Sequence, residues 1–189
     1  WAPNQEKAFR KILFLASIFP IYWFVFPFLR KKANLQFFLK IFFISTFISA
    51  LIGLVQFFSQ FILGLNSLIE FQSRITPFFL GQNFSEIVLT YNSWLVNVGG
   101  HTIFRVIGLF PDPHLFSLFL NISLPVGFYL YHQTKNSYYL LATGIILSTS
   151  LLTFSRAGYL SLIIAFILIW IKLANKKKTI SRKKHFLKL

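Results

Sequence analysis

The chain has 189 residues, of which 56% are hydrophobic and only 12% are charged, and its formal net charge is +15. A soluble domain of this size carries about 25% charged residues, so the composition excludes an ordinary soluble enzyme and favours an integral membrane protein. The absence of cysteine excludes disulfides and thiolate metal sites. Because the sequence begins at Trp1 without a signal-peptide pattern, we expect it to be an internal part of a longer protein.

Five apolar segments predict an all-α fold, a polytopic bundle of transmembrane helices in a single domain. The expected spans cover residues 11–29, 37–63, 115–131, 138–154 and 158–171, and a basic tail follows over 174–189. The first span is interrupted by Pro20 and Pro27. The fifth is short, but Tyr159 and Trp170 at its ends suit membrane interfaces.

The basic residues lie in blocks beside the apolar runs, as in RKKANLQFFLK at 30–40 and KKKTISRKKHFLK at 176–188. If residues 30–40, residues 132–137 and the C-terminal segment from Lys172 onward face the cytoplasm, they hold 13 of the 19 Lys and Arg residues (4, 1 and 8, respectively). This distribution follows the positive-inside rule. We therefore expect membrane lipids, and not nucleic acid, to be the partners of these charges.

Residues 64–114 then form one long loop on the outer face. A structureless loop of that length is unusual, and long loops are often functional. Within it the run EIVLTYNSWLVNV, at 86–98, indicates an interfacial helix.

The outer-face cations after position 11 are all arginines, Arg74, Arg105 and Arg156, and no lysine occurs between Ile41 and Thr134. The third and fourth spans form a hairpin that brings Arg105 and Arg156 to the same membrane side. A guanidinium stays charged in a poor dielectric and binds phosphate in bidentate fashion. The alternatives are a snorkelling or capping role for Arg156, an ion pair of Arg105 with Asp112, and plain surface charge for Arg74.

Two histidines on the outer side, His101 and His114, are candidate bases near neutral pH, with a solvated loop position as the alternative for each. Asp112 lies between Pro111 and Pro113, which indicates a rigid turn into the third span. The sequence has no Gly-rich phosphate loop, paired carboxylates or metal-ligand cluster. It therefore predicts no cofactor and no metal site.

The segments FRVIGLFPDPHLFSLFLNISLPVGFYLY, at 104–131, and LLTFSRAGYLSLIIAFILIW, at 151–170, resemble the O-antigen ligase and O-antigen polymerase family of bacterial envelopes. The positions that carry the resemblance are Arg105, Gly108, Pro113, Ser155 and Arg156. Gly53 and Gln56, in ALIGLVQFF, resemble the preceding span of that family. His114 stands where asparagine is common. The family also implies a catalytic histidine in a second outer loop, which would lie beyond Leu189, so the catalytic residue is not identified.

The resemblance implies transfer of a polyprenyl-diphosphate-linked glycan to lipid A core, another glycan or a protein, at the outer face of the bacterial cytoplasmic (inner) membrane. Arg105 and Arg156, with Arg74 as a third candidate, would bind the diphosphate, and the aromatic-rich spans would form a groove for the prenyl tail. The further candidate residues are His114, Asp112 and His101.

Several alternatives stay open. Within the family the chain fits an O-antigen ligase, an O-antigen polymerase or a protein O-oligosaccharyltransferase. A transporter for lipid-linked glycans predicts internal repeats and polar groups at mid-span, but the spans hold only scattered Ser and Thr with Gln56 and Asn121. A non-enzymatic membrane scaffold predicts that lysine can replace Arg156 without harm.

Overall fold

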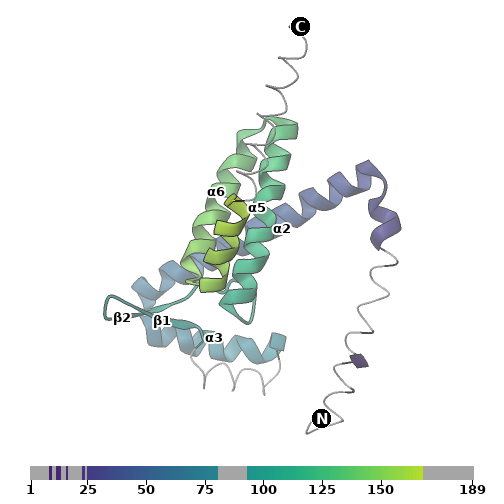
Figure 1. Cartoon of the computed structure of the whole chain (residues 1–189). Helices are drawn as coiled ribbons and strands as arrows, with labels where there is room; N and C mark the ends of the chain where they lie inside the picture. Colours follow the sequence, from purple (N-terminus) through teal and green to yellow (C-terminus); the bar gives the residue numbers. More distant parts are fainter. Residues whose placement is uncertain are drawn as a thin grey trace, which may run out of the picture. The chain divides into compact units, whose positions relative to one another are not determined.

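The computed structural model describes residues 25–80 and 93–167, together with the isolated positions 9, 12, 13, 16 and 23. This part of the chain is mostly helical (Figure 1). Its elements are α2 (Lys32–Leu63), α3 (Leu65–Leu80), β1 (Leu95–Val98), β2 (His101–Phe104), α5 (Pro113–Thr134) and α6 (Ser137–Leu152), followed by the helix Arg156–Ile167. Most of the predicted first span and the whole basic tail lie outside the described residues.

The described helices agree with the predicted spans at 37–63, 115–131 and 138–154. The helix Arg156–Ile167 overlaps the predicted fifth span, 158–171. By length and composition, α2 with 32 residues and α5 with 22 residues are able to cross a membrane. The other two, α6 and Arg156–Ile167, are shorter apolar helices. The bundle of five spans remains a prediction.

The chain divides into two compact units, Trp1–Ile44 and Ser45–Leu189, with the boundary inside α2. In the first unit a bend at Arg30 precedes α2, and the Arg30 guanidinium lies 5.0 Å from the ring centroid of Phe26. The Asn34 side chain donates to the carbonyl of Phe28 across the same bend, at 3.0 Å. Every residue of the candidate site belongs to the second unit.

The predicted helix over residues 86–98 is wrong in the part that the structure describes, because Leu95–Val98 forms β1 and pairs antiparallel with β2. Val98 stands opposite His101, so Gly99 and Gly100 form a two-residue turn. Both glycines have positive φ, 60° and 86°, which is the conformation that this type of hairpin turn requires. The described part of the chain is therefore mostly helical but also contains a two-stranded hairpin, which the prediction of an all-α fold did not include.

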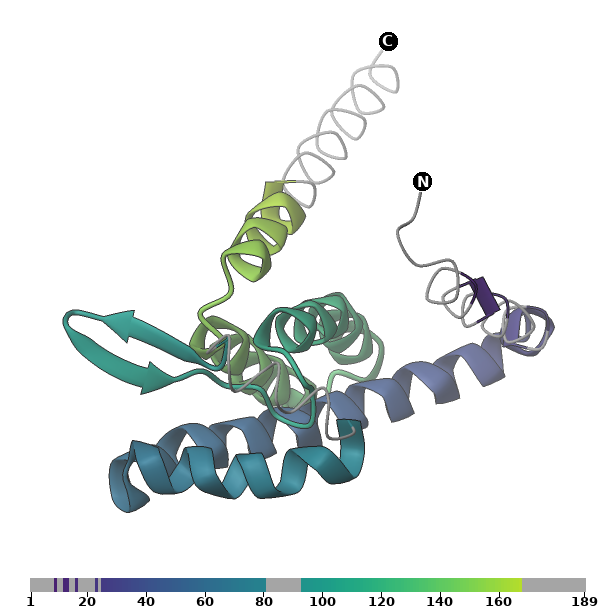
Figure 2. The same cartoon turned by 90° about the horizontal axis from the view of Figure 1, so that it is seen from below.

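The predicted outer loop also contains a helix, α3, which follows α2 directly (Figure 2). Gly64 ends α2 with a φ of +82°, a left-handed conformation that reverses the chain. One face of α3 buries Leu68 against the base of the hairpin. The small apolar core at this point consists of Leu68, Trp94, Phe104 and Ile107, with Leu65, Ile69 and Leu95 packed against it.

The helices α5 and α6 form an antiparallel hairpin around a short turn (Figure 1). Lys135 adopts a left-handed φ of 56° at the end of α5. The side chain of Asn136 then caps α6 by accepting from the backbone N–H of Tyr138 at 2.9 Å. Because the turn is so short, the end of α6 returns the chain to the level of the start of α5.

The hairpin of α5 and α6 buries small polar side chains together with apolar ones such as Phe116, Leu120 and Ile146, and it leaves other large apolar side chains exposed. Ser117, Ser123, Thr143, Thr149 and Ser150 are buried, whereas Leu118, Ile122, Phe128, Leu141 and Leu151 are exposed. A soluble protein buries its large apolar residues first. Small polar residues at helix contacts with apolar residues on the outer surface are typical of helices that pack within a lipid bilayer.

Candidate functional site

The segment Phe104–Gly108 leads from the β-hairpin toward α5, and two glutamines of α2 hold it in place. The Gln56 side chain donates to the carbonyl of Gly108 and accepts from its N–H, both at 2.9 Å. One turn later, Gln60 accepts from the N–H of Phe104 at 2.8 Å and donates to its carbonyl at 3.4 Å. The two amides act as substitutes for a neighbouring β-strand, since each offers a donor and an acceptor to one residue's backbone.

Arg105 lies between these two clamped residues, and its side chain is buried, with 8% of its surface exposed. Its guanidinium donates to three backbone carbonyls: Nε to Thr153 at 2.8 Å, Nη1 to Ser93 at 3.0 Å and Nη2 to Phe154 at 3.1 Å. A guanidinium has five N–H groups, so one remains on each Nη atom. Arg105 therefore joins the hairpin to the turn that follows α6.

Burial lowers the pKa of the Arg105 guanidinium from its ordinary value, because desolvation disfavours the charged form. The carboxylate of Asp112 opposes this shift through its negative charge. Within residues 93–167 the two side chains nevertheless form no ion pair. Asp112 instead caps α5, where its Oδ2 atom accepts from the N–H groups of His114 and Leu115 at 2.9 and 3.1 Å.

The turn after α6 ends at Ser155, which directly precedes the helix Arg156–Ile167. Its Oγ atom accepts from the N–H of Gly158 at 3.1 Å, the geometry of a serine N-cap. Arg156 is the first residue of this helix and is exposed. No hydrogen bond or ion pair engages its side chain within the part of the chain that the structure describes. Arg156 follows Phe154 by two residues in the chain, and Arg105 binds the carbonyl of Phe154.

His114, in the first turn of α5, is linked to the same turn. Its Nδ1 atom lies 2.8 Å from Oγ of Ser155, so the start of α5 and the start of the helix Arg156–Ile167 are held together by side chains. The sequence interpretation included His114 as a candidate but gave no partner for it. The structure thus brings Arg105, Arg156, His114 and Ser155 together around one turn.

Asn121 extends this junction along α5. Its side-chain nitrogen donates to the carbonyl of Gly158 at 3.0 Å and to Oγ of Ser161 at 2.7 Å, and its oxygen accepts from Ser150 at 2.6 Å. Gly158 is also close to Ser117, because a Cβ atom added at Gly158 would lie 2.9 Å from the Cβ atom of Ser117. The helix Arg156–Ile167 therefore packs on α5 through a glycine and on α6 through a shared polar cluster.

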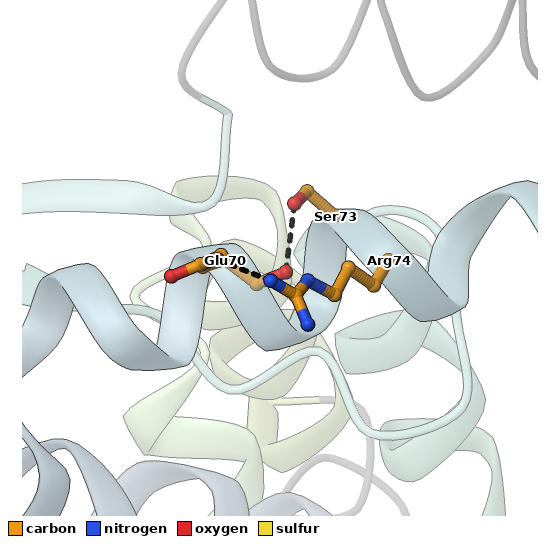
Figure 3. Close-up of polar contacts among 3 residues, drawn as sticks. All are labelled: Glu70, Ser73 and Arg74. Atoms are coloured by element: carbon orange, nitrogen blue, oxygen red, sulfur yellow. Dashed lines mark hydrogen bonds and ion pairs between the residues drawn. The ribbon is translucent and has the colours of Figure 1, made fainter.

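The other two candidates are placed elsewhere. Arg74 is exposed on α3 and pairs with Glu70 one turn earlier at 2.6 Å, as Figure 3 shows. Ser73 bonds the Glu70 carbonyl at the same place. His101 is the exposed first residue of β2, opposite Val98. Among the described residues, no hydrogen bond or ion pair connects Arg74 or His101 with the turn at Ser155.

An apolar groove of about 940 Å³ lies between α2, α3 and the loop after Arg105. Its walls are mainly Leu, Ile, Val and Phe side chains, among them Leu51, Val55 and Phe71. Gln56 and Gly108, which hydrogen-bond each other, also line it. The loop Ile107–Phe110 thus forms one wall of the groove and continues the segment that carries Arg105.

Sequence interpretation missed the roles of Gln60, Ser155 and the three carbonyls that bind Arg105. For the glutamines a signal was present, because Gln56 and Gln60 lie four residues apart on one face of a mainly apolar helix. For the carbonyls there was none. Among the described residues no group of three or more His, Cys, Asp or Glu side chains is placed to hold a metal ion.

Comparison of the chain with protein-family models, with curated proteins and with solved structures gives no match. The chemistry of the site is inferred from its own residues.

Proposed function

We propose that this chain forms the diphosphate-binding part of a membrane glycan transferase of the O-antigen ligase and polymerase type. Its donor would be a polyprenyl-diphosphate-linked glycan, and its active face would lie outward on the bacterial cytoplasmic membrane. The observation that carries this proposal is the position of Arg156. It is an exposed and unengaged arginine, among the described residues, at the start of a helix and two residues after Phe154, whose carbonyl the buried Arg105 binds.

Stability alone does not account for an arginine at this position. The N-terminus of a helix carries partial positive charge, so a cation in the first turn costs about 0.3–1 kcal/mol instead of stabilising the helix. Arg156 also caps no helix end, since Ser155 supplies the cap. An anion at this point would be favoured by the guanidinium and by the helix dipole together.

Arg105 adds a second positive charge in a fixed position. Because three of its N–H groups bind backbone carbonyls, its guanidinium is preorganised and does not have to reorient when charge develops on a ligand. We assign the N–H group that remains on each Nη atom to the anion. In this proposal Arg105 is both the anchor of the turn and the second ligand of the diphosphate.

The groove between α2 and α3 supports a lipid-linked donor. A volume of about 940 Å³ lies within the range of ligand pockets, and its apolar walls suit a hydrocarbon chain. Its wall at Ile107–Phe110 follows Arg105 directly in the chain. We assign the prenyl tail to this groove and the diphosphate to the arginines.

In the proposed reaction an acceptor hydroxyl attacks the anomeric carbon of the donor sugar as the bond from that carbon to the diphosphate oxygen breaks. The electron pair of the broken bond stays on the diphosphate, where Arg156 and Arg105 stabilise the developing negative charge. The proton of the acceptor hydroxyl passes to a base that is not assigned in this chain. No nucleotide and no metal ion takes part in this scheme.

The test compares Arg156→Ala and Arg156→Lys with Arg74→Ala, in which an exposed arginine of α3 is removed. Transfer from a polyprenyl-diphosphate-linked glycan is measured in membranes with equal amounts of inserted protein, offering lipid A core, glycan and protein acceptors in parallel. We expect Arg156→Ala to abolish transfer and Arg156→Lys to weaken it strongly, because lysine cannot bind phosphate in bidentate fashion. Arg74→Ala should remain active. Full activity of Arg156→Ala would reject the proposal. Unchanged transfer by Arg156→Lys would show that a positive charge is sufficient at this position and that bidentate phosphate binding is not required, whereas no transfer by the wild type would favour a scaffold.

A further inference from the structure

The hydroxyl of Ser155 fixes the tautomer of His114. The Ser155 side chain is fully buried, with 0% of its surface exposed, so its hydroxyl hydrogen needs an acceptor within the protein. Its Oγ atom already accepts from the N–H of Gly158, which cannot accept in return. The remaining neighbour in hydrogen-bond range among the described residues is Nδ1 of His114, at 2.8 Å.

The Ser155 hydroxyl therefore donates to Nδ1, and Nδ1 carries no hydrogen. In a neutral imidazole the hydrogen then lies on Nε2. The opposite tautomer, with Nδ1 donating to Oγ, would leave the buried hydroxyl hydrogen without an acceptor among the described residues, which is costly for a buried group. His114 is thus held as a hydrogen-bond donor through Nε2.

This donor lies at the turn that presents Arg156. The His114 side chain is exposed, and its Nε2 atom has no partner among the described residues. Arg156 follows Ser155 directly, so the bond between Ser155 and His114 links the imidazole to the start of the arginine's helix. The helix start and the imidazole N–H at this turn, and the guanidinium of the residue that follows Ser155, are all groups that favour an anion.

We propose that the Nε2–H of His114 donates to a phosphate oxygen of the anion that Arg156 binds. The inference rests on the proposed function, because it adds a residue to the same diphosphate site. It also excludes His114 as the base of the transfer reaction, since a base would need a free electron pair on Nε2. His114 is a binding residue, and Ser155 is the residue that positions it.

The test uses inorganic pyrophosphate and farnesyl diphosphate as probes, with the protein in detergent or nanodiscs. His114→Asn keeps a short acceptor for the Ser155 hydroxyl but removes the N–H at the position of Nε2. We expect unchanged thermal stability and about tenfold weaker binding of both probes, the usual effect of losing one hydrogen bond to a charged group. His132→Leu, at the other end of α5, is the matched control and should bind like the wild type.

The tautomer is tested separately by nitrogen NMR with ¹⁵N-labelled histidine, where an unprotonated Nδ1 has a distinct chemical shift. The signal of His114 is assigned as the one missing from His114→Asn. We expect an unprotonated Nδ1 in the free protein and a shift of the Nε2–H signal when pyrophosphate is added. Tighter binding of farnesyl diphosphate than of pyrophosphate would identify the lipid-linked ligand, and equal binding would identify the free anion.

The outcomes separate the two proposals. If Arg156→Ala loses binding while His114→Asn binds like the wild type, or if Nδ1 is protonated, the inference about His114 is wrong and the proposed function stands. If the wild type binds neither probe, or Arg156→Ala binds both normally, the proposed function itself fails, and the inference fails with it.

Discussion

Gln56 and Gly108 exchange two hydrogen bonds of 2.9 Å, although 52 residues separate them in the chain. The amide of Gln56 thereby completes the backbone hydrogen bonding of a residue whose φ is +58°. Gln60 does the same for Phe104 four residues earlier in the segment. Two polar side chains of a mainly apolar helix thus fix the segment that carries Arg105. Removing either side chain tests this arrangement.

Replacing Gln60 by leucine is expected to destabilise the protein by about 1–3 kcal/mol, because the buried N–H of Phe104 loses its acceptor. The measurement is thermal unfolding in detergent. Ser59→Ala is the matched control, since Ser59 bonds only a carbonyl of its own helix, that of Gln56 at 2.7 Å. Equal melting temperatures of Gln60→Leu and Ser59→Ala would contradict the clamp.

Replacing Arg105 by lysine is expected to loosen the turn at Thr153 and Phe154. A single ammonium cannot reproduce the planar fork that reaches three carbonyls in different directions. Hydrogen exchange should therefore become faster in residues 150–158 than in α3. Arg74→Lys provides the comparison, because its exposed pair with Glu70 contributes at most about 1 kcal/mol. Unchanged protection around Thr153 would show that Arg105 does not anchor the turn.

The sequence allowed the prediction of the helical hairpin and of the return of the chain after it to the neighbourhood of Arg105, which binds the carbonyl of Phe154. Both follow from local patterns, namely two apolar runs and a short polar turn. The β-hairpin at Gly99 and Gly100 was missed, because a short apolar run such as Trp94–Val98 fits a helix and a strand almost equally well. The Gly-Gly pair was the signal that distinguishes them.

The partners of Arg105 could not be predicted from the sequence. Every residue has a backbone carbonyl, so a side chain that binds carbonyls leaves no pattern in the residues it contacts. The same holds for Gln56 and Gly108. Arg105 was expected to pair with phosphate or with Asp112, since only those partners have a recognisable chemistry in the sequence. Its three carbonyl contacts became visible only from the fold.

Replacing Asn121 by leucine is expected to destabilise the packing of the helix Arg156–Ile167 on α5. Three hydrogen bonds are lost, to Ser150, Gly158 and Ser161. Such bonds between membrane helices average about 0.6 kcal/mol each, so the expected total is about 2 kcal/mol. Thermal unfolding in detergent measures it, with Ser148→Ala in α6 as the control because Ser148 bonds only its own helix. A cost no larger than that of Ser148→Ala would show that the cluster does not hold the helices together.

Replacing Gly158 by alanine is expected to separate the same helices by a steric effect. The added Cβ atom would lie 2.9 Å from the Cβ atom of Ser117 and 3.2 Å from that of Ser155, closer than packed carbon atoms allow. Overpacking of this kind costs about 1–3 kcal/mol. Gly144→Ala in α6 is the control, since a Cβ atom there meets nothing within 4 Å. Alanine is also the better helix former by about 0.8–1 kcal/mol, so Gly144→Ala should raise the stability.

The double variant Gly158→Ala with Ser117→Gly identifies the cause of the loss. Removing the Ser117 side chain opens the space that the new methyl group needs, so part of the stability lost in Gly158→Ala should return, against the cost of a glycine in the middle of α5. If the two changes simply add, the contact between Gly158 and Ser117 is not what limits the approach of the helices. The N–H of Gly158 also donates to the Ser155 side chain that caps the helix. If the variants displace the start of this helix, they should also alter binding at Arg156.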